Sequence, residues 1–160
     1  MTNLIDHTYF TRDIIKVPQR SEVIERLNDA ISINEPIYLD RLLGSELHEQ
    51  FIQGLDNPVP DAKWIELRDI IVNADTKLSA IAYYVYVKFY TANQSIFTGL
   101  GDVKPNVENG IIADRYKIVN AWNKMVVLNT NIYNAMVNSS YEYDVDTDLA
   151  LYNIDTLLDV

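Results

Sequence analysis

The sequence has no cysteine and only two histidines, His7 and His48. Without cysteine the chain can form no disulfide, no thiolate zinc site and no cysteine nucleophile. Neither histidine has a second metal-type ligand at a helical or loop spacing. Glu46 and Glu49 lie near His48, but carboxylates beside a helical histidine are common, and we interpret His48 as structural. The sequence therefore predicts no metal and no other cofactor.

Long apolar runs are also missing. No stretch approaches the ~20 apolar residues of a membrane-spanning helix, and the N-terminus lacks the pattern of a signal peptide. We therefore expect neither feature and no membrane contact. Hydrophobic residues make up 48% of the chain and charged residues 22%, which is the balance of a folded, soluble protein. With 160 residues, the chain can bury a sizeable core without disulfides or metals.

Basic residues are absent from the C-terminal end. The formal net charge is -10, and residues 141–160 hold six acidic residues and no basic one. The first 140 residues carry 13 basic and 17 acidic residues, a net charge of -4. A nucleic-acid-binding surface needs clustered Lys and Arg side chains, whereas here they are scattered singly. The charge pattern thus argues against DNA or RNA as the main partner.

Catalytic and nucleotide-binding signatures are absent as well. Gly99 and Gly101 lack the Gly-Lys-Ser/Thr step of a phosphate-binding loop, and no serine lies in a nucleophile-elbow pattern. Residues 144–148 have the alternating aspartates of a calcium loop but neither its central glycine nor its distal glutamate. Asp144 and Asp146 alternate with apolar residues as in an extended tail, which is a poor place to hold two carboxylates at catalytic separation. We predict that the protein is not an enzyme.

A first helix is indicated after residue 20. Ser21 is a candidate N-cap, and the apolar residues that follow share one helical face. We expect this helix to stop near Asn34, because Pro36 donates no backbone hydrogen bond and disfavours helix at Glu35.

Shorter elements and loops follow. Residues 37–43 form a second helical segment that ends at Gly44, a candidate helix-terminating glycine. Ser45 starts the next helix, and residues 54–60, which contain two prolines, are predicted to be a loop. Residues 93–110 are the longest irregular connection, and connections of this length are usually functional or mobile.

Three longer helices carry the predicted core. Asp61 is a candidate N-cap for the first, a break near residues 73–76 precedes the second, and the third covers residues 111–137. The predicted core residues are Trp64, Leu67, Leu78, Ile81, Val85, Phe89, Val119, Trp122 and Val126. The sequence thus predicts an all-α fold, a small helical bundle of about four to five helices with extended N- and C-terminal arms. The expected divisions are an N-terminal arm (1–20), a helical bundle domain (21–138) and an acidic C-terminal arm (139–160).

The acidic C-terminal arm also contains many apolar residues. Its first half alternates Tyr or Val with Glu or Asp, which is a strand's period. A free acidic tail should not expose so much apolar surface, and Tyr with Leu is typical of interfaces. Folding back onto the chain's own bundle stays open, but we predict docking on a neighbouring subunit or an adjacent protein. The predicted interface residues are Tyr141, Tyr143, Leu149, Leu151, Tyr152, Leu157 and Leu158.

The stretch of residues 31–55 resembles the small helical head-tail connector proteins of tailed bacteriophages. It contains the sequence Ile-Tyr-Leu-Asp-Arg-Leu-Leu-Gly-Ser-Glu-Leu at residues 37–47. In that family an early helix runs into a Leu-Leu-Gly turn, and a Leu-x-x-x-Phe/Tyr segment follows. The paired helices over residues 67–90, the Thr98-Gly99 loop and the long helix from Ile111 are similar in order to versions from crAss-like phages. The resemblance covers most of residues 20–137 and leaves the acidic arm unexplained.

The resemblance implies a structural virion subunit at the head-tail junction, assembled in the host bacterial cytoplasm. Such subunits form a homo-oligomeric ring that matches the portal's twelvefold symmetry, bind the portal protein and neighbouring tail or connector proteins, and seal the head. DNA would pass through without specific binding, because an acidic or polar lumen lets the duplex slide. The alternative is an acidic helical inhibitor or DNA-mimic binding protein of phage origin, which would present its carboxylates as an ordered surface row.

Overall fold

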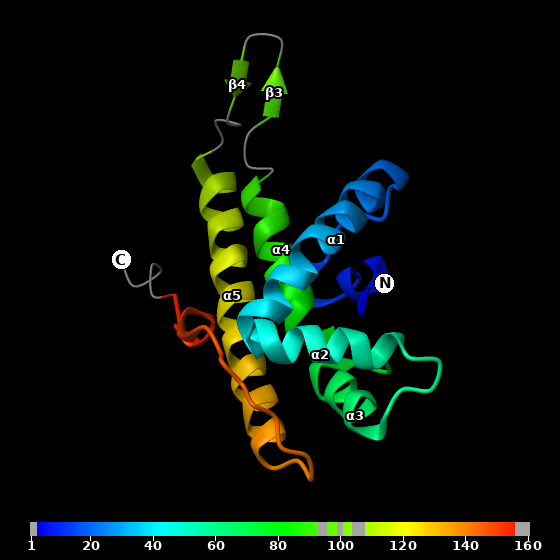
Figure 1. The fold of residues 1–160 in the computed structure, drawn as a ribbon. Helices are drawn as coiled ribbons and strands as arrows, with labels where there is room; N and C mark the ends of the chain where they lie inside the picture. Colours follow the sequence, from blue (N-terminus) through cyan, green and yellow to red (C-terminus); the bar gives the residue numbers. More distant parts are fainter. Residues whose placement is uncertain (1–2, 93–95, 99–100, 104–107, 156–160) are drawn as a thin grey trace.

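The computed structural model describes residues 3–92, 96–98, 101–103 and 108–155, and side chains within residues 3–92 and 115–155. In these ranges the chain forms five α-helices, three short 3-10 helices and two two-stranded antiparallel ribbons. The α-helices are α1 (Ser21–Leu43), α2 (Ser45–Asp56), α3 (Ala62–Ile71), α4 (Ala80–Ala92) and α5 (Glu108–Val137). The predicted all-α bundle of four to five helices is confirmed (Figure 1).

The smaller elements connect or flank these helices. The 3-10 helices are η1 (His7–Phe10), η2 (Asp13–Ile15) and η3 (Leu149–Tyr152). Strand β1 (Val72–Asn73) pairs with β2 (Leu78–Ser79) between α3 and α4, at the break predicted there. Strand β3 (Ile96–Thr98) pairs with β4 (Gly101–Val103) and extends beyond the adjoining ends of α4 and α5 (Figure 1).

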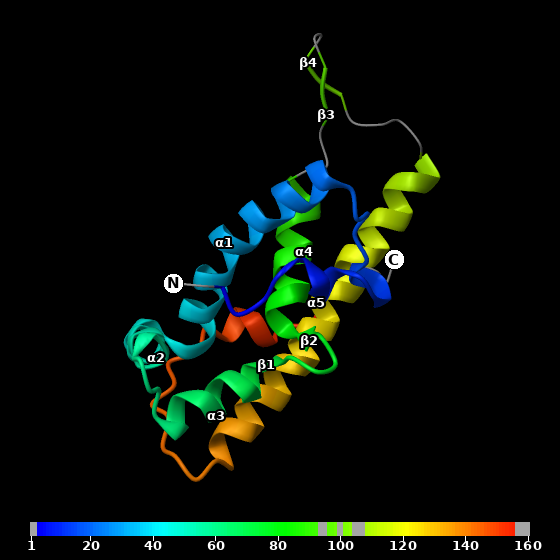
Figure 2. The ribbon, with the colours of Figure 1, turned by 90° about the vertical axis from the view of Figure 1, so that its right-hand side faces the viewer.

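Helix α4 is the centre of the bundle. It packs between α1 and α5, which lie on opposite sides of it (Figures 1 and 2). Its first seven residues, 80–86, are all buried. A helix with apolar residues all round is stable only when neighbours cover every side, and the position of α4 meets that requirement.

Helix α1 continues through Pro36, so the predicted end near Asn34 is wrong and residues 37–43 belong to the same helix. Proline removes one helical hydrogen bond and strains the preceding turn. Tertiary contacts on both sides of it offset that loss. Tyr38 is fully buried, and the buried carboxylate of Glu35 accepts hydrogen bonds from the N-terminal segment.

Two other helix boundaries differ from the sequence prediction. Ser21 is the first residue of α1, not its N-cap, which is Arg20. Helix α2 continues past Gly54, so the predicted loop begins too early. A Cβ added to Gly54 would lie 2.1 Å from Cδ1 of Trp64. This glycine therefore allows two helices to approach closely and does not mark a turn.

The predicted core is largely correct. Leu67, Ile81, Val85, Phe89, Val119 and Val126 are buried, and Trp64 and Trp122 are half-buried. Leu78 was assigned wrongly, because its side chain is 44% exposed. It lies in β2, before α4 begins, and so the helical periodicity does not apply to it.

The N-terminal residues belong to the core and do not form an extended arm. Ile5, Tyr9, Phe10, Ile15 and Val17 are all buried. The short 3-10 turns of η1 and η2 place these side chains inward without the 3.6-residue period of an α-helix. This explains why the segment shows little regular pattern in the sequence.

Candidate interaction surfaces

The C-terminal segment, residues 143–155, runs back along the bundle and completes the C-terminal end of α1 (Figure 1). The last turn of a helix leaves carbonyl groups without partners inside the helix. Here the segment supplies donors to three consecutive carbonyls. The pairs are Asp148 N with Arg41 O at 2.8 Å, Thr147 Oγ1 with Leu42 O at 2.6 Å, and Asp146 N with Leu43 O at 3.2 Å.

Gly44 makes this arrangement possible. Its φ of +82° lies in the region that favours glycine. A Cβ at this position would also lie 2.8 Å from Cβ of Asp146. Gly44 therefore both ends α1, as predicted, and provides the space for the C-terminal segment.

The charges at this end of α1 partly oppose one another. Aspartates near a helix C-terminus interact unfavourably with the helix dipole. Arg41 offsets this effect, because its Nε lies 2.8 Å from Oδ2 of Asp148 and its Nη1 donates to the hydroxyl of Tyr84 at 3.2 Å. The backbone N–H of Ala150 and then Arg41 lower the pKa of Asp148, which keeps this carboxylate ionised.

A buried polar network holds the next part of the segment. The hydroxyl of Tyr38 donates to Oδ1 of Asn129 at 2.5 Å, and Nδ2 of Asn129 donates to the carbonyl of Leu151 at 2.8 Å. All three residues are fully buried. Burial raises the pKa of Tyr38 well above its ordinary value, so the hydroxyl remains a donor. Because buried polar groups need partners, the network favours η3 in this position on α1 and α5.

Three of the predicted interface residues contact the chain's own bundle. Leu151 is fully buried, and Tyr143 and Tyr152 are half-buried. The hydroxyl of Tyr143 donates to the carbonyl of Lys63 at 3.1 Å, and the ring of Tyr152 packs edge-on against Tyr133. The prediction that the arm docks on a neighbour is therefore wrong for Leu151, because its own chain encloses it.

The other predicted residues are placed differently. Tyr141 is half-buried, Leu149 is 77% exposed, and Leu157 and Leu158 lie outside the described residues. Leu149 thus remains a candidate for contact with a partner. The predicted alternation over residues 142–148 is seen in the exposure of the side chains, because the odd-numbered residues are half-buried and the even-numbered residues are exposed. The stretch nevertheless forms no strand.

The N-terminal segment is attached through the carboxylate of Glu35. Its Oε1 accepts the N–H of Leu4 at 2.7 Å and its Oε2 accepts the N–H of Ile5 at 3.1 Å. Glu35 is only 2% exposed, and burial raises its pKa to about 7 despite these two hydrogen bonds. The side chain was not singled out by the sequence, where a glutamate before proline suggested only a helix end.

A second attachment of this segment is Asp13. Its carboxylate accepts hydrogen bonds from Lys124 of α5 and from the hydroxyl of Tyr83 of α4, the latter at 2.8 Å. The hydrogen bond from Lys124 is the main cause that lowers the pKa of Asp13. The N-terminal segment is thereby tied to α1, α4 and α5, and the described parts of both terminal segments pack against the bundle.

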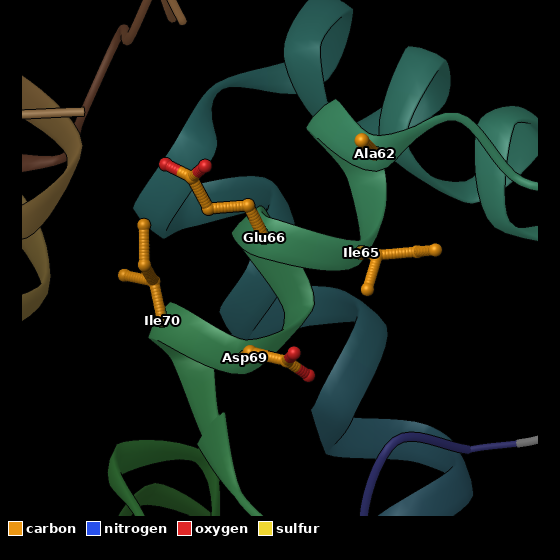
Figure 3. A pocket seen from close by; sticks show the side chains of 5 residues that line it. All are labelled: Ala62, Ile65, Glu66, Asp69 and Ile70. Atoms are coloured by element: carbon orange, nitrogen blue, oxygen red, sulfur yellow. The ribbon is translucent and has the colours of Figure 1, made fainter. Parts of the chain in front are cut away.

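A shallow hollow of about 470 Å³ lies on α3, lined by Ala62, Ile65, Glu66, Asp69 and Ile70. Figure 3 shows that these side chains leave a single helix in different directions and do not converge. Small-molecule sites enclose most of the ligand surface with a few convergent polar groups. The hollow does not have this form.

Among the described residues, two further surfaces with exposed apolar side chains lie on α1 and α5. The α1 face consists of Glu22, Glu25, Arg26, Asp29, Ile33 and Ile37, which are all exposed. The α5 face consists of Tyr116, Lys117, Asn120, Lys124 and Val127, of which Asn120 is half-buried and the rest are exposed. Ile33 is 62% exposed and Val127 58%. Periodicity alone could not identify them, because their exposure depends on where the two chain ends pack.

Within the part of the chain that the structure describes, no group of three or more His, Asp or Glu residues could hold a metal ion. Nδ1 of His48 lies 3.8 Å from Oδ1 of Asp40, and burial lowers the pKa of this histidine. No described helix is long and apolar enough to cross a membrane.

The chain was compared with protein-family models, curated proteins and solved structures, and none of these comparisons found a match.

Proposed function

We propose that the chain is a structural subunit that assembles into a ring, as the connector between portal and tail of a tailed bacteriophage. The observation that carries the proposal is that α4 packs between α1 and α5, and that each of these two outer helices has exposed apolar residues. A closed ring needs two different surfaces on each subunit, so that one subunit's first surface meets the next subunit's second. Exposed apolar side chains on both faces provide surfaces of this kind.

The order of elements also supports this function. The Leu42-Leu43-Gly44 turn ends α1, and Leu47 and Phe51 are the buried residues of the Leu-x-x-x-Phe segment that follows. The paired helices and the long helix α5 come next, in the order on which the resemblance to connector proteins rests. In this role the subunit works by assembly, at the head-tail junction of the virion. Its partners are further copies of itself, the portal protein and adjacent tail proteins, and DNA passes through the lumen without specific binding.

One observation favours the alternative, an acidic inhibitor or DNA mimic. Glu142, Asp144, Asp146 and Asp148 are all exposed, at every second position of one extended segment. In extended chain such positions are roughly 6.5 Å apart, and the contacts with α1 hold Asp146 and Asp148 in place. These carboxylates therefore form an ordered row, which is the arrangement that a basic partner surface would recognise.

Native mass spectrometry with negative-stain electron microscopy separates the two functions. The proposal predicts closed rings of the full-length protein at micromolar concentration, with twelve copies in the phage connector role. A folded monomer that binds a basic nucleic-acid-binding protein would favour the inhibitor. A folded monomer that forms no rings at micromolar concentration and binds no basic nucleic-acid-binding protein would overturn the ring proposal.

A further inference from the structure

We propose that the α1 face of one copy docks on the α5 face of the next copy. This inference rests on the proposed ring and adds which surfaces form the contact between subunits. The partner is a second copy of this chain, and three properties of the two faces support it: opposite charge, exposed apolar centres, and helices that start at the same end of the molecule.

The two faces carry opposite charge. The N-terminal half of the α1 face holds three acidic residues, Glu22, Glu25 and Asp29, and one basic residue, Arg26, which gives it a net charge of -2. Residues 115–137 of α5, by contrast, contain three basic residues and no acidic one, although the chain as a whole has a net charge of -10. Like-charged surfaces repel each other, so most of this acidic protein opposes self-association. On the α5 face the carboxylate of Asp13 already pairs with Lys124, so Lys117 supplies the positive charge on which the acidic α1 face can dock.

Apolar side chains occupy matching places on the two faces. On α1, the midpoint of Ile33 and Ile37 lies eight residues after the midpoint of Glu25 and Asp29, which is about 12 Å along a helix. On α5, Val127 follows Lys117 by ten residues, about 15 Å. A lysine side chain is long enough to span the difference of about 3 Å between these two spacings. When the two helices run parallel, the charged residues of one face can therefore contact those of the other while the apolar residues also contact each other.

The two helices also start at the same end of the molecule. The N-terminal ends of α1 and α5 both point toward the end of the bundle from which β3 and β4 extend (Figures 1 and 2). A rotation about an axis along the bundle moves each copy sideways without changing its height. Such a rotation brings the acidic end of one α1 face to the basic end of the neighbouring α5 face, as a cyclic ring requires.

Charge reversal tests the pairing. The variants are Asp29→Lys, Lys117→Glu and the two combined, with Asp144→Lys as a matched control on the exposed C-terminal segment. A fourth variant, Ile33→Asp, disrupts the apolar centre. All these residues are exposed, and circular dichroism establishes that each variant is folded. The readout is the protein concentration at which half of the subunits are in rings, measured by mass photometry at low and high salt.

We expect each single reversal to raise this concentration at least about tenfold at low salt, because like charges then face each other. The combined variant restores assembly to near the wild-type value, Asp144→Lys leaves it unchanged, and Ile33→Asp abolishes rings. If the wild type forms rings and all the face variants assemble equally well, the pairing is refuted while the ring function stands. If the combined variant stays as defective as the singles, the charge pairing is likewise refuted. If the wild type forms no rings, the proposed function itself fails.

Discussion

Glu35 should make the stability of the fold depend on pH in an unusual direction. Burial raises its pKa from an ordinary value of 4.5 to about 7, so the folded chain binds this proton more tightly than the unfolded chain does. The contribution of Glu35 to the free energy of unfolding is then largest below pH 4.5 and falls as the pH rises to about 7. A rise of the pKa from 4.5 to about 7 corresponds to about 3 kcal/mol.

Urea unfolding at pH 5, 6, 7 and 8 measures this loss, with Glu35→Gln as the reference. Glutamine keeps the size of the side chain but does not titrate, so the difference in pH dependence between the two proteins isolates Glu35. The reference is necessary because His48 acts in the opposite direction. Its lowered pKa means that stability is lost as the pH falls below 6.5, and both proteins share this effect.

Hydrogen exchange at the amides of Leu4 and Ile5 gives a second readout, since these groups donate to Glu35. We expect both amides to exchange through a local opening that becomes easier from pH 5 to pH 8, after correction for the intrinsic exchange rate. Tyr9 is the neighbouring titratable group, and burial raises its pKa above 10, so it stays neutral in this range. Equal pH dependence of the wild type and Glu35→Gln would refute the reasoning.

Two further substitutions test the attachment of the C-terminal segment. Gly44→Ala should destabilise the protein by about 1 to 3 kcal/mol, because alanine is strained at a φ of +82° and its Cβ would collide with Asp146. Limited proteolysis should then cleave the variant faster than the wild type within residues 139–150. Unchanged cleavage would contradict the role of Gly44. Asn129→Leu should cost about 2 to 4 kcal/mol, because it leaves the Tyr38 hydroxyl and the Leu151 carbonyl buried without partners. Urea unfolding should show partial recovery when Tyr38→Phe is added, and purely additive losses would contradict the network.

Helical periodicity and turn residues were sufficient to predict the fold class and most of the core. The apolar sequence of α4 and the spacing of Val119 and Val126 on α5 are enough to predict which sides of these two helices are buried. Pro36 shows the limit of such local rules. The helix continues past it because Tyr38 and Glu35 are held by residues far away in the sequence, and no local pattern contains that information.

The interaction surfaces could not be predicted in the same way, because they are formed by contacts between residues that lie far apart in the sequence. Asn129 did give a signal, since it interrupts an apolar stripe, but its partners Tyr38 and Leu151 are 91 and 22 residues away. The composition of the acidic arm suggested that its apolar residues must be covered, which is true of Leu151 but not of Leu149 and Ile154. It could not decide between the chain's own bundle and a neighbour, because both would bury the same side chains.

The positions of the two chain ends change where self-association has to be sought. The N-terminal segment uses the inner side of α1 through Glu35, and the C-terminal segment uses the carbonyls at the end of α1. Exchange of either segment with a neighbour would first have to break buried hydrogen bonds in its own subunit, whereas docking on the outer side of α1 breaks none of them. With both described terminal segments packed against the bundle, Ile33 and Ile37 remain exposed on the α1 face, and Lys117 and Val127 remain exposed on the α5 face. A ring built from these two faces can therefore form from subunits that are already folded.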